Sequence, residues 1–333
     1  MKEAMFFRKL KDNVVQCSLC PHSCVIKDNE RGKCGVRENR QGVLYALTYG
    51  KPISSAIDPI EKKPLYHFLP GSSSYSIACV GCNLSCLFCQ NSDISQMLKE
   101  GRILGTDASV QDVVDEAIAS GCKSISYTYT EPTIFFEYAY DIARLAKSKG
   151  IKNVFVTNGF ISKDAIEFIS PFLDAANIDL KGFTDEYYQR VCGARLQPVL
   201  DAIQLYYDKG VHIELTTLIV PGQNDDPSIL KSIAEFIARI DKRIPWHISR
   251  FFPQYKMAGL PPTPVESIRK AEQIGKESGL KYIYPGNLGE ESDTACQHCS
   301  KTLIKRKGFF VSENNLVGER CRFCNAKADI ITK

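Results

Sequence analysis

Residues 75–91 read YSIACVGCNLSCLFCQN, and this stretch joins a short apolar run to a closely spaced group of cysteines. The run from Tyr75 to Cys79 has the composition of a buried β-strand. Cys82, Cys86 and Cys89 follow on one loop, so their thiolates can converge on a single cluster. A [4Fe–4S] cluster normally takes four cysteines, and three leave one iron open to an outside ligand.

A tetrahedral zinc ion is the alternative interpretation of these cysteines, with Cys79 or His67 as a fourth ligand. Zinc sites favour paired C-x-x-C knuckles over the C-x-x-x-C-x-x-C spacing found here. The spacing therefore favours an iron–sulfur cluster.

Around this loop, seven β-rich runs alternate with helical periodicity, which predicts a parallel sheet with right-handed crossovers. The expected strands span residues 75–79, 124–129, 153–157, 176–180, 212–220, 246–251 and 281–284. We expect an α/β fold, a partial or full parallel (β/α) barrel, with a doubly wound open sheet as the alternative. In such barrels the chemistry lies at the C-terminal ends of the strands, which we call the mouth.

Three helices between these strands have clear boundaries. One is expected to follow Asp107 as its N-cap and to end at Gly121. The others are expected over residues 133–149 and 227–240, the last beginning with Pro227, a residue favoured in the first turn.

Composition narrows the function classes. Across 333 residues, 42 Lys plus Arg face 38 Asp plus Glu, so no strong field attracts nucleic acid or a membrane surface. The first residues lack the apolar core of a signal peptide, which predicts a cytoplasmic protein. In a reducing compartment, 14 cysteines indicate metal binding rather than disulfides. Cys122 and Cys192 stand alone, and we expect both simply to pack in the core.

The chain divides into a cysteine-rich segment with a β-connection (residues 1–73), the barrel (74–289) and a terminal element (290–333). The last contains two C-x-x-C knuckles, which predict a zinc ribbon or a rubredoxin-like iron site. Its predicted ligands are Cys296, Cys299, Cys321 and Cys324. We expect both small elements to pack near the mouth, and residues 61–67 either to fold over it or to form a plain β-connection.

The N-terminal cysteines form a less regular set, which suits either zinc or a second iron–sulfur cluster. Pro21 and His22 crowd the loop between them, and this favours structural zinc. The predicted ligands are Cys17, Cys20, Cys24 and Cys34.

The spacing of Cys82, Cys86 and Cys89, with Phe88 before the last cysteine, resembles the signature of the radical S-adenosylmethionine (SAM) superfamily. The resemblance implies that SAM chelates the open iron and that Phe88 packs against its adenine. It also implies that one electron cleaves SAM to methionine and a 5′-deoxyadenosyl radical. No catalytic residue beyond the cluster is identified.

Further motifs resemble the branch containing pyruvate formate-lyase activating enzyme. Tyr129-Thr130-Glu131-Pro132 is similar to its Gly-Gly-Glu-Pro, without the glycines, and Thr157-Asn158-Gly159-Phe160 is similar to its Asp-Thr-Asn-Gly-Phe, with Val156 at the Asp position. Asp179-Leu180-Lys181 matches its Asp-Leu-Lys. The resemblance implies a SAM site formed by Thr130, Glu131, Asn158, Asp179, Lys181 and His247.

Along nearly its whole length the chain resembles the radical SAM member of the AmmeMemoRadiSam system. The motifs are Cys17-x-x-Cys20-Pro21-His22-x-Cys24, Asp58-Pro59-Ile60-Glu61-Lys62-Lys63-Pro64, Tyr127-Thr128-Tyr129-Thr130-Glu131-Pro132 and Tyr284-Pro285-Gly286-Asn287. This implies Memo-like and Ammecr-like companion proteins, a flavodoxin- or ferredoxin-like electron donor, and hydrogen abstraction from a small-molecule or peptide substrate.

Two other functions remain open at this point. One is a glycyl-radical enzyme activase, which acts on a protein. The other is a zinc-dependent RNA-binding module with a vestigial cluster loop, in which Lys305-Arg306-Lys307 and Phe309-Phe310 would contact RNA.

Overall fold

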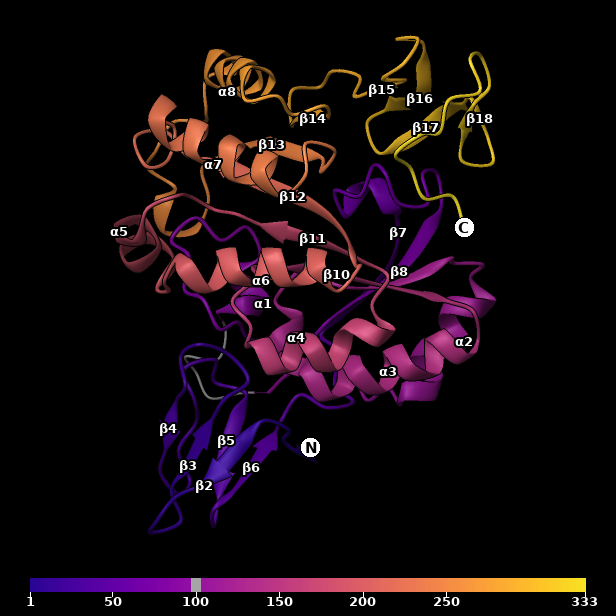
Figure 1. Ribbon diagram of the computed structural model, residues 1–333. Helices are drawn as coiled ribbons and strands as arrows, with labels where there is room; N and C mark the ends of the chain where they lie inside the picture. Colours follow the sequence, from indigo (N-terminus) through magenta and orange to yellow (C-terminus); the bar gives the residue numbers. More distant parts are fainter. Residues whose placement is uncertain (97–102) are drawn as a thin grey trace.

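The computed structural model describes residues 1–96 and 103–333, and its largest sheet has eight strands in the order β14-β13-β12-β11-β10-β9-β8-β7 (Figure 1). Strands β8 to β14 run parallel, and β7 joins the edge antiparallel to β8. The strands are β7 (Ser54–Pro59), β8 (Ser73–Ala78), β9 (Ser124–Tyr127), β10 (Lys152–Thr157), β11 (Ala175–Asp179), β12 (His212–Ile219), β13 (Trp246–Arg250) and β14 (Ile283–Gly286).

The expected partial (β/α) barrel is confirmed. The parallel strands follow one another in chain order without the reversal of a doubly wound sheet, and β7 and β14 are the two edges of an unclosed barrel. Helices cover its outer face (Figure 1). The α-helices of the described residues are α1 (Ser92–Ser95), α2 (Val110–Ala119), α3 (Phe136–Ser148), α4 (Lys163–Ile169), α5 (Asp185–Tyr187), α6 (Gln197–Asp208), α7 (Pro227–Ile240) and α8 (Val265–Glu277).

Short helical turns complete the connections. They are η1 (Ile60–Lys62), η3 (Pro132–Phe135), η4 (Ser170–Phe172), η5 (Tyr188–Cys192) and η6 (Tyr255–Met257). In the described part of the chain, no helix combines the length and apolarity needed to cross a bilayer.

All seven predicted strands exist, but one predicted helix start is wrong. Helix α2 is capped by Ser109 rather than Asp107: the Ser109 hydroxyl accepts from the Asp112 amide at 3.1 Å, and the Asp112 carboxylate accepts from the Ser109 amide at 2.8 Å. This reciprocal capping box outcompetes Asp107, which instead pairs with Lys51. The helix expected over residues 133–149 begins as the turn η3 and continues as α3.

The N-terminal segment folds into two small antiparallel sheets at the mouth. Leu19 accepts a hydrogen bond from the Ser162 amide after β10, and the carbonyl of Pro21 accepts from Arg195. The buried Arg37 fixes this segment to α3 through two bonds to Glu137, at 2.7 and 3.0 Å. The strands are β1 (Lys2–Glu3), β2 (Phe7–Lys9), β3 (Val15–Cys17), β4 (Val25–Ile26), β5 (Arg37–Arg40) and β6 (Val43–Ala46).

The C-terminal element lies at the other end of the barrel, so the expectation that it packs near the mouth is wrong. Its last residues meet the segment before β8: the amide of Ile331 donates to the His67 carbonyl, and the His67 ring bonds the Asp329 carbonyl. Figure 1 shows it far from the N-terminal sheets. The strands are β15 (Thr294–Ala295), β16 (Thr302–Lys307), β17 (Phe310–Asn314), β18 (Leu316–Val317) and β19 (Arg320–Cys321).

Residues 60–69 close the N-terminal end of the barrel, not its mouth. Leu65 and Phe68 pack against Val154 and Ala175, near the starts of β10 and β11. The amides of Tyr66 and His67 donate to the buried carboxylate of Glu214 in β12, at 3.0 and 2.7 Å. An apolar plug and a satisfied carboxylate therefore seal this end.

The basic run 305–307 contributes a core residue rather than a continuous basic surface. Arg306 is 0% exposed, donates to the Tyr66 carbonyl at 2.7 Å, and lies 4.3 Å from the centre of the Tyr66 ring. This cation fixes the C-terminal element to the plug. It is not available to bind phosphate.

We predict that Arg306→Ala lowers the free energy of unfolding by about 3 kcal/mol, because it removes a buried cation and leaves its acceptors unpaired. The exposed Lys307→Ala should change it by less than about 0.5 kcal/mol. Urea unfolding of both variants measures the difference. Equal effects would show that Arg306 does not fix the element.

Stability should also depend on the protonation of His67. Burial lowers its pKa from 6.5 to about 4, although the Glu214 carboxylate opposes the shift. As pH falls through 6.5, the unfolded chain binds a proton that the native state excludes, so stability falls between pH 6.5 and 4. We predict a loss of about 2 kcal/mol between pH 7 and 5 that is absent in His67→Asn. Urea titrations at both pH values test this, and equal pH slopes would contradict it.

Candidate active site

The three central cysteines lie on the loop between β8 and α1 at the mouth. The amides of Ser85 and Leu87 donate to the carbonyls of Cys192 and Val191, at 2.9 and 3.0 Å. Those acceptors belong to η5, a single π-helical turn, an irregularity that is frequent at functional sites. The loop that carries the cysteines is therefore held by backbone groups of a segment about one hundred residues away.

Each of the three thiols has its own polar neighbour. The side-chain amide nitrogen of Asn158 lies 3.7 Å from the Cys82 sulfur, and the Ser95 hydroxyl lies 3.1 Å from the Cys89 sulfur. The thiol of Cys192 neighbours that of Cys86 and lowers its pKa. Hydrogen bonds to ligand sulfurs tune the potential of an iron–sulfur cluster, so this surrounding suits such a group.

Both proposed fourth ligands of the zinc alternative are engaged elsewhere. Cys79 is buried and its thiol faces the Thr48 carbonyl at 3.6 Å. The ring of His67 bonds the Asp329 carbonyl and the Tyr284 hydroxyl, at 2.6 and 2.7 Å. The three cysteines keep the incomplete ligand set that an open-iron cluster needs.

Glu131 is fully buried and connects the ends of β9 and β10. Its carboxylate accepts hydrogen bonds from the Thr157 hydroxyl at 2.7 Å and from the Asn158 backbone amide at 2.8 Å. It also accepts from the backbone amide and the hydroxyl of Thr133. Burial raises its pKa, although these hydrogen bonds oppose the shift. The side chain is saturated by protein donors, so it shapes the mouth by positioning its neighbours.

Tyr129 occupies a glycine position of the resembled motif and adopts a φ of 63°. This left-handed conformation is costly for a residue with a side chain. The side chain has strong partners that offset the cost: its hydroxyl donates to Asp58, and the Lys63 ammonium lies 4.3 Å from the ring centre. The adjacent Thr130 hydroxyl bonds the Cys79 carbonyl at 2.7 Å, so the strand end meets the cluster loop.

Asp179 and Lys181 bring opposite charges to the mouth. Asp179 ends β11, and its carboxylate accepts from the Lys181 ammonium at 2.7 Å. That ammonium lies 5.7 Å from the ring centre of the buried Phe88, on the cluster loop. With side chains 34% and 14% exposed, the pair can still meet a ligand that carries both an amine and a carboxylate.

His247 does not join this group. Its Nε2 pairs with Glu214 at 2.7 Å, and its ring stacks on Tyr284, with 5.3 Å between ring centres, while Tyr66 meets it edge-on. These partners belong to the packed interior near the plug. The position supports a structural role, not the expected contact with SAM.

Cys192 is a site residue that sequence reasoning missed. It was expected only to pack, and it is buried, but its thiol lies beside Cys86 and its carbonyl accepts a hydrogen bond from the Ser85 amide. A lone cysteine gives no spacing signal. Only the fold brings residue 192 to the cluster loop.

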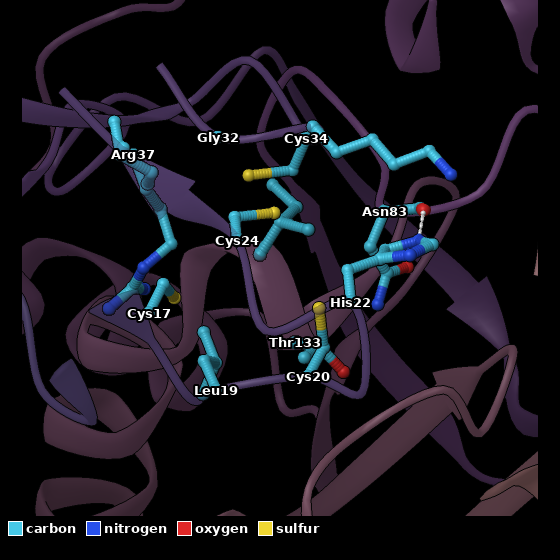
Figure 2. Close-up of a pocket in the computed structure, with 13 residues that line it drawn as sticks. Cys17, Leu19, Cys20, His22, Cys24, Gly32, Cys34, Arg37, Asn83 and Thr133 are labelled. Carbon is cyan, nitrogen blue, oxygen red and sulfur yellow. Dashed lines mark hydrogen bonds between the residues drawn. The ribbon is translucent and has the colours of Figure 1, made fainter. Parts of the chain in front are cut away.

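The two terminal cysteine sets differ in geometry. The ligand atoms of Cys296, Cys299, Cys321 and Cys324 all lie within 4.8 Å of one another, close enough for one tetrahedral ion. The N-terminal set instead lines a cavity in the N-terminal segment (Figure 2). Its cysteines are Cys17, Cys20, Cys24 and Cys34.

Comparison with known proteins finds one matching family profile and several similar sequences. A sequence profile of the Radical SAM superfamily matches residues 76–233. An uncharacterized protein of Methanocaldococcus jannaschii is 46% identical over 336 residues, covering 99% of this chain and 100% of that protein. Pyruvate formate-lyase 1-activating enzyme of Escherichia coli is 25% identical over 224 residues, covering 61% and 89%.

Among solved structures, Streptococcus suis SuiB bound to S-adenosylmethionine has a similar fold. Its TM-score is 0.50 at 13% identity, and the match covers 62% of this chain and 48% of that one. At this identity the likeness concerns the fold alone.

Cys192 generates a prediction for any cluster held by Cys82, Cys86 and Cys89. Cys192→Ala removes the polar neighbour of the Cys86 sulfur, and a polar interaction of about 1 kcal/mol corresponds to roughly 40 mV for one electron. We predict a midpoint potential lower by that amount in potentiometric titration. Cys122→Ala, at the other lone buried cysteine, should leave it unchanged; equal shifts would contradict the assignment.

Proposed function

The chain belongs to the radical SAM superfamily, and from this premise we propose that Cys82, Cys86 and Cys89 bind three irons of a [4Fe–4S] cluster whose fourth iron takes SAM. The substrate we propose is a small molecule or a peptide. One observation carries this proposal: three thiols share a loop at the mouth, while Cys79 and His67 are bonded to other groups.

When bound, the cluster supplies one electron that cleaves SAM to methionine and a 5′-deoxyadenosyl radical, which removes a hydrogen atom from the substrate. The protein's task is to orient and to shield. The buried Phe88 covers one side of the loop with an apolar ring, and Cys86 is only 7% exposed. This packing limits the access of water and oxygen to the cluster.

We propose that Asp179 and Lys181 bind the charged methionyl end of SAM. Lys181 is a compact cation suited to a carboxylate, and Asp179 offers an acceptor to an amine. Thr130 and Asn158 act beside them, Thr130 by joining the strand end to the loop and Asn158 through its amide near Cys82. Val156 occupies the position at which the resembled family has an aspartate. We therefore expect the Asp179 carboxylate to make more of the polar contacts with SAM.

As partners we propose a flavodoxin- or ferredoxin-like one-electron donor, together with the Memo-like and Ammecr-like companions of the AmmeMemoRadiSam system. The motifs around Cys17, Asp58 and Tyr284 support membership of that system. For the C-terminal cysteines we propose zinc, because their mutual distances suit a tetrahedral ion. A cytoplasmic location agrees with fourteen free cysteines, all within the described residues.

A glycyl-radical activase is the second candidate. The match over 89% of pyruvate formate-lyase 1-activating enzyme favours it, and a protein substrate would then replace the small one. The RNA-binding alternative has less support, because the buried Arg306 interrupts its basic run.

We predict that the anaerobically reconstituted protein, given dithionite and SAM, forms 5′-deoxyadenosine. Cys82→Ala, Cys86→Ala and Cys89→Ala should each reduce the yield at least a hundredfold, because each removes an iron ligand. Mass spectrometry of the product provides the measurement.

Cys79→Ala is the matched control. Cys79 lies three residues before Cys82, is buried, and its thiol donates to the Thr48 carbonyl. It should retain most of the yield. Unaltered product in all three ligand variants, or an equal loss in the control, would refute the assignment.

A further inference from the structure

The four N-terminal cysteines surround one cavity. Cys17 ends β3, Cys20 and Cys24 lie on the loop that leads to β4, and Cys34 precedes β5. Figure 2 shows their sulfur atoms pointing toward the cavity from different sides. The rest of the lining is largely apolar and includes Leu19 and Ile26, so an inserted group would be shielded from solvent.

The sulfur positions argue against a single ion. In residues 1–96 and 103–333, only the C-terminal set forms a group of three or more ligand atoms that could hold one ion, and its atoms lie within 4.8 Å of one another. Zinc–sulfur bonds of about 2.3 Å require such closeness. A four-iron cubane keeps its cysteines farther apart, because each sulfur binds a different iron. Among the described residues, neither the N-terminal set nor Cys82, Cys86 and Cys89 forms such a single-ion group.

A second, independent observation is that the buried Arg37 side chain has a donor with no acceptor. Its side chain is 2% exposed and lines the cavity. The terminal nitrogens bond Glu137 and the Met5 carbonyl, but Nε has no hydrogen-bond partner. A buried donor is rarely left unpaired, and the sulfurs of a cluster with a net negative charge would accept from it.

The cavity is connected to the catalytic loop through Asn83. The His22 ring forms a hydrogen bond with the Asn83 carbonyl at 2.7 Å, and it packs at a tilt against the Phe160 ring, with 4.8 Å between ring centres. The Asn83 side chain accepts from the Asn158 amide at 2.9 Å, beside the Cys82 sulfur. Cys34 and Cys82 also line one shared cleft. Residues of both cysteine sets therefore border one cleft, and Asn83 connects their loops.

We propose that Cys17, Cys20, Cys24 and Cys34 bind a second [4Fe–4S] cluster that passes electrons to the catalytic one. Four cysteines leave no open iron, which suits electron transfer and excludes SAM binding at this cluster. A low-potential one-electron donor of the flavodoxin class reduces the second cluster. That cluster then returns to its oxidised state by giving the same electron to the catalytic cluster. The relay rests on the proposed function, whereas the presence of the second cluster does not.

The test uses the full chain with Cys82, Cys86 and Cys89 all replaced by alanine. After anaerobic reconstitution with iron and sulfide, we expect about eight irons and one zinc per chain in the wild-type protein and about four irons and one zinc in the triple variant. The variant should show an EPR signal of a reduced cubane. Circular dichroism and the retained zinc report that it is folded.

Zinc at the N-terminal set would overturn the proposal: the triple variant would then hold no iron and two zinc ions. These readouts do not depend on SAM cleavage. Failure of the proposed function would instead appear as absent 5′-deoxyadenosine in the wild-type protein.

A second variant tests the relay. In Cys20→Ala/Cys34→Ala, reduction of the catalytic cluster by reduced flavodoxin should slow at least tenfold. Titanium(III) citrate, a small reductant that can reach the catalytic cluster directly, should restore most of the 5′-deoxyadenosine formation that is lost with flavodoxin. An equal loss with both reductants, or no loss with flavodoxin, would reject the relay.

Discussion

The hydrogen bonds to the buried carboxylate of Glu131 are the interaction on which the mouth depends. They hold the end of β9 against the end of β10 and fix the backbone of Asn158. The Asn158 side chain then meets both Cys82 and Asn83, and Asn83 meets His22 of the N-terminal segment. One buried acid thus sets the relative positions of two cysteine-bearing loops.

The barrel has two ends with opposite physical character. At the N-terminal end, residues 60–69 and the C-terminal element close the opening, and the interior polar groups there are paired, as Glu214 is with His247 and two backbone amides. At the mouth lie groups that can still bind a ligand, namely three thiols and the partly exposed pair of Asp179 and Lys181.

Much of the fold could be predicted, because strand periodicity and the C-x-x-x-C-x-x-C spacing are local signals. The seven strands were placed correctly, and the polar motifs fall at their C-terminal ends. The start of α2 was misplaced because two good caps, Asp107 and Ser109, lie close together, and only the reciprocal bond with Asp112 distinguishes them. His247 was misjudged because its partners, Glu214 and Tyr284, come from other strands.

The sequence by itself determined the chemistry of this protein: thiol spacing on one loop defines an incomplete cluster site, and alternating strands and helices require a parallel sheet. Only the tertiary structure decided which distant groups complete the site. Cys192 and Arg37 lie in no motif, and Asn83 occupies an unspecified position between Cys82 and Cys86. The opposite placements of the two small cysteine elements follow from contacts between residues a hundred or more positions apart. Local pattern records what a loop can bind, whereas burial and partnership arise from packing between segments.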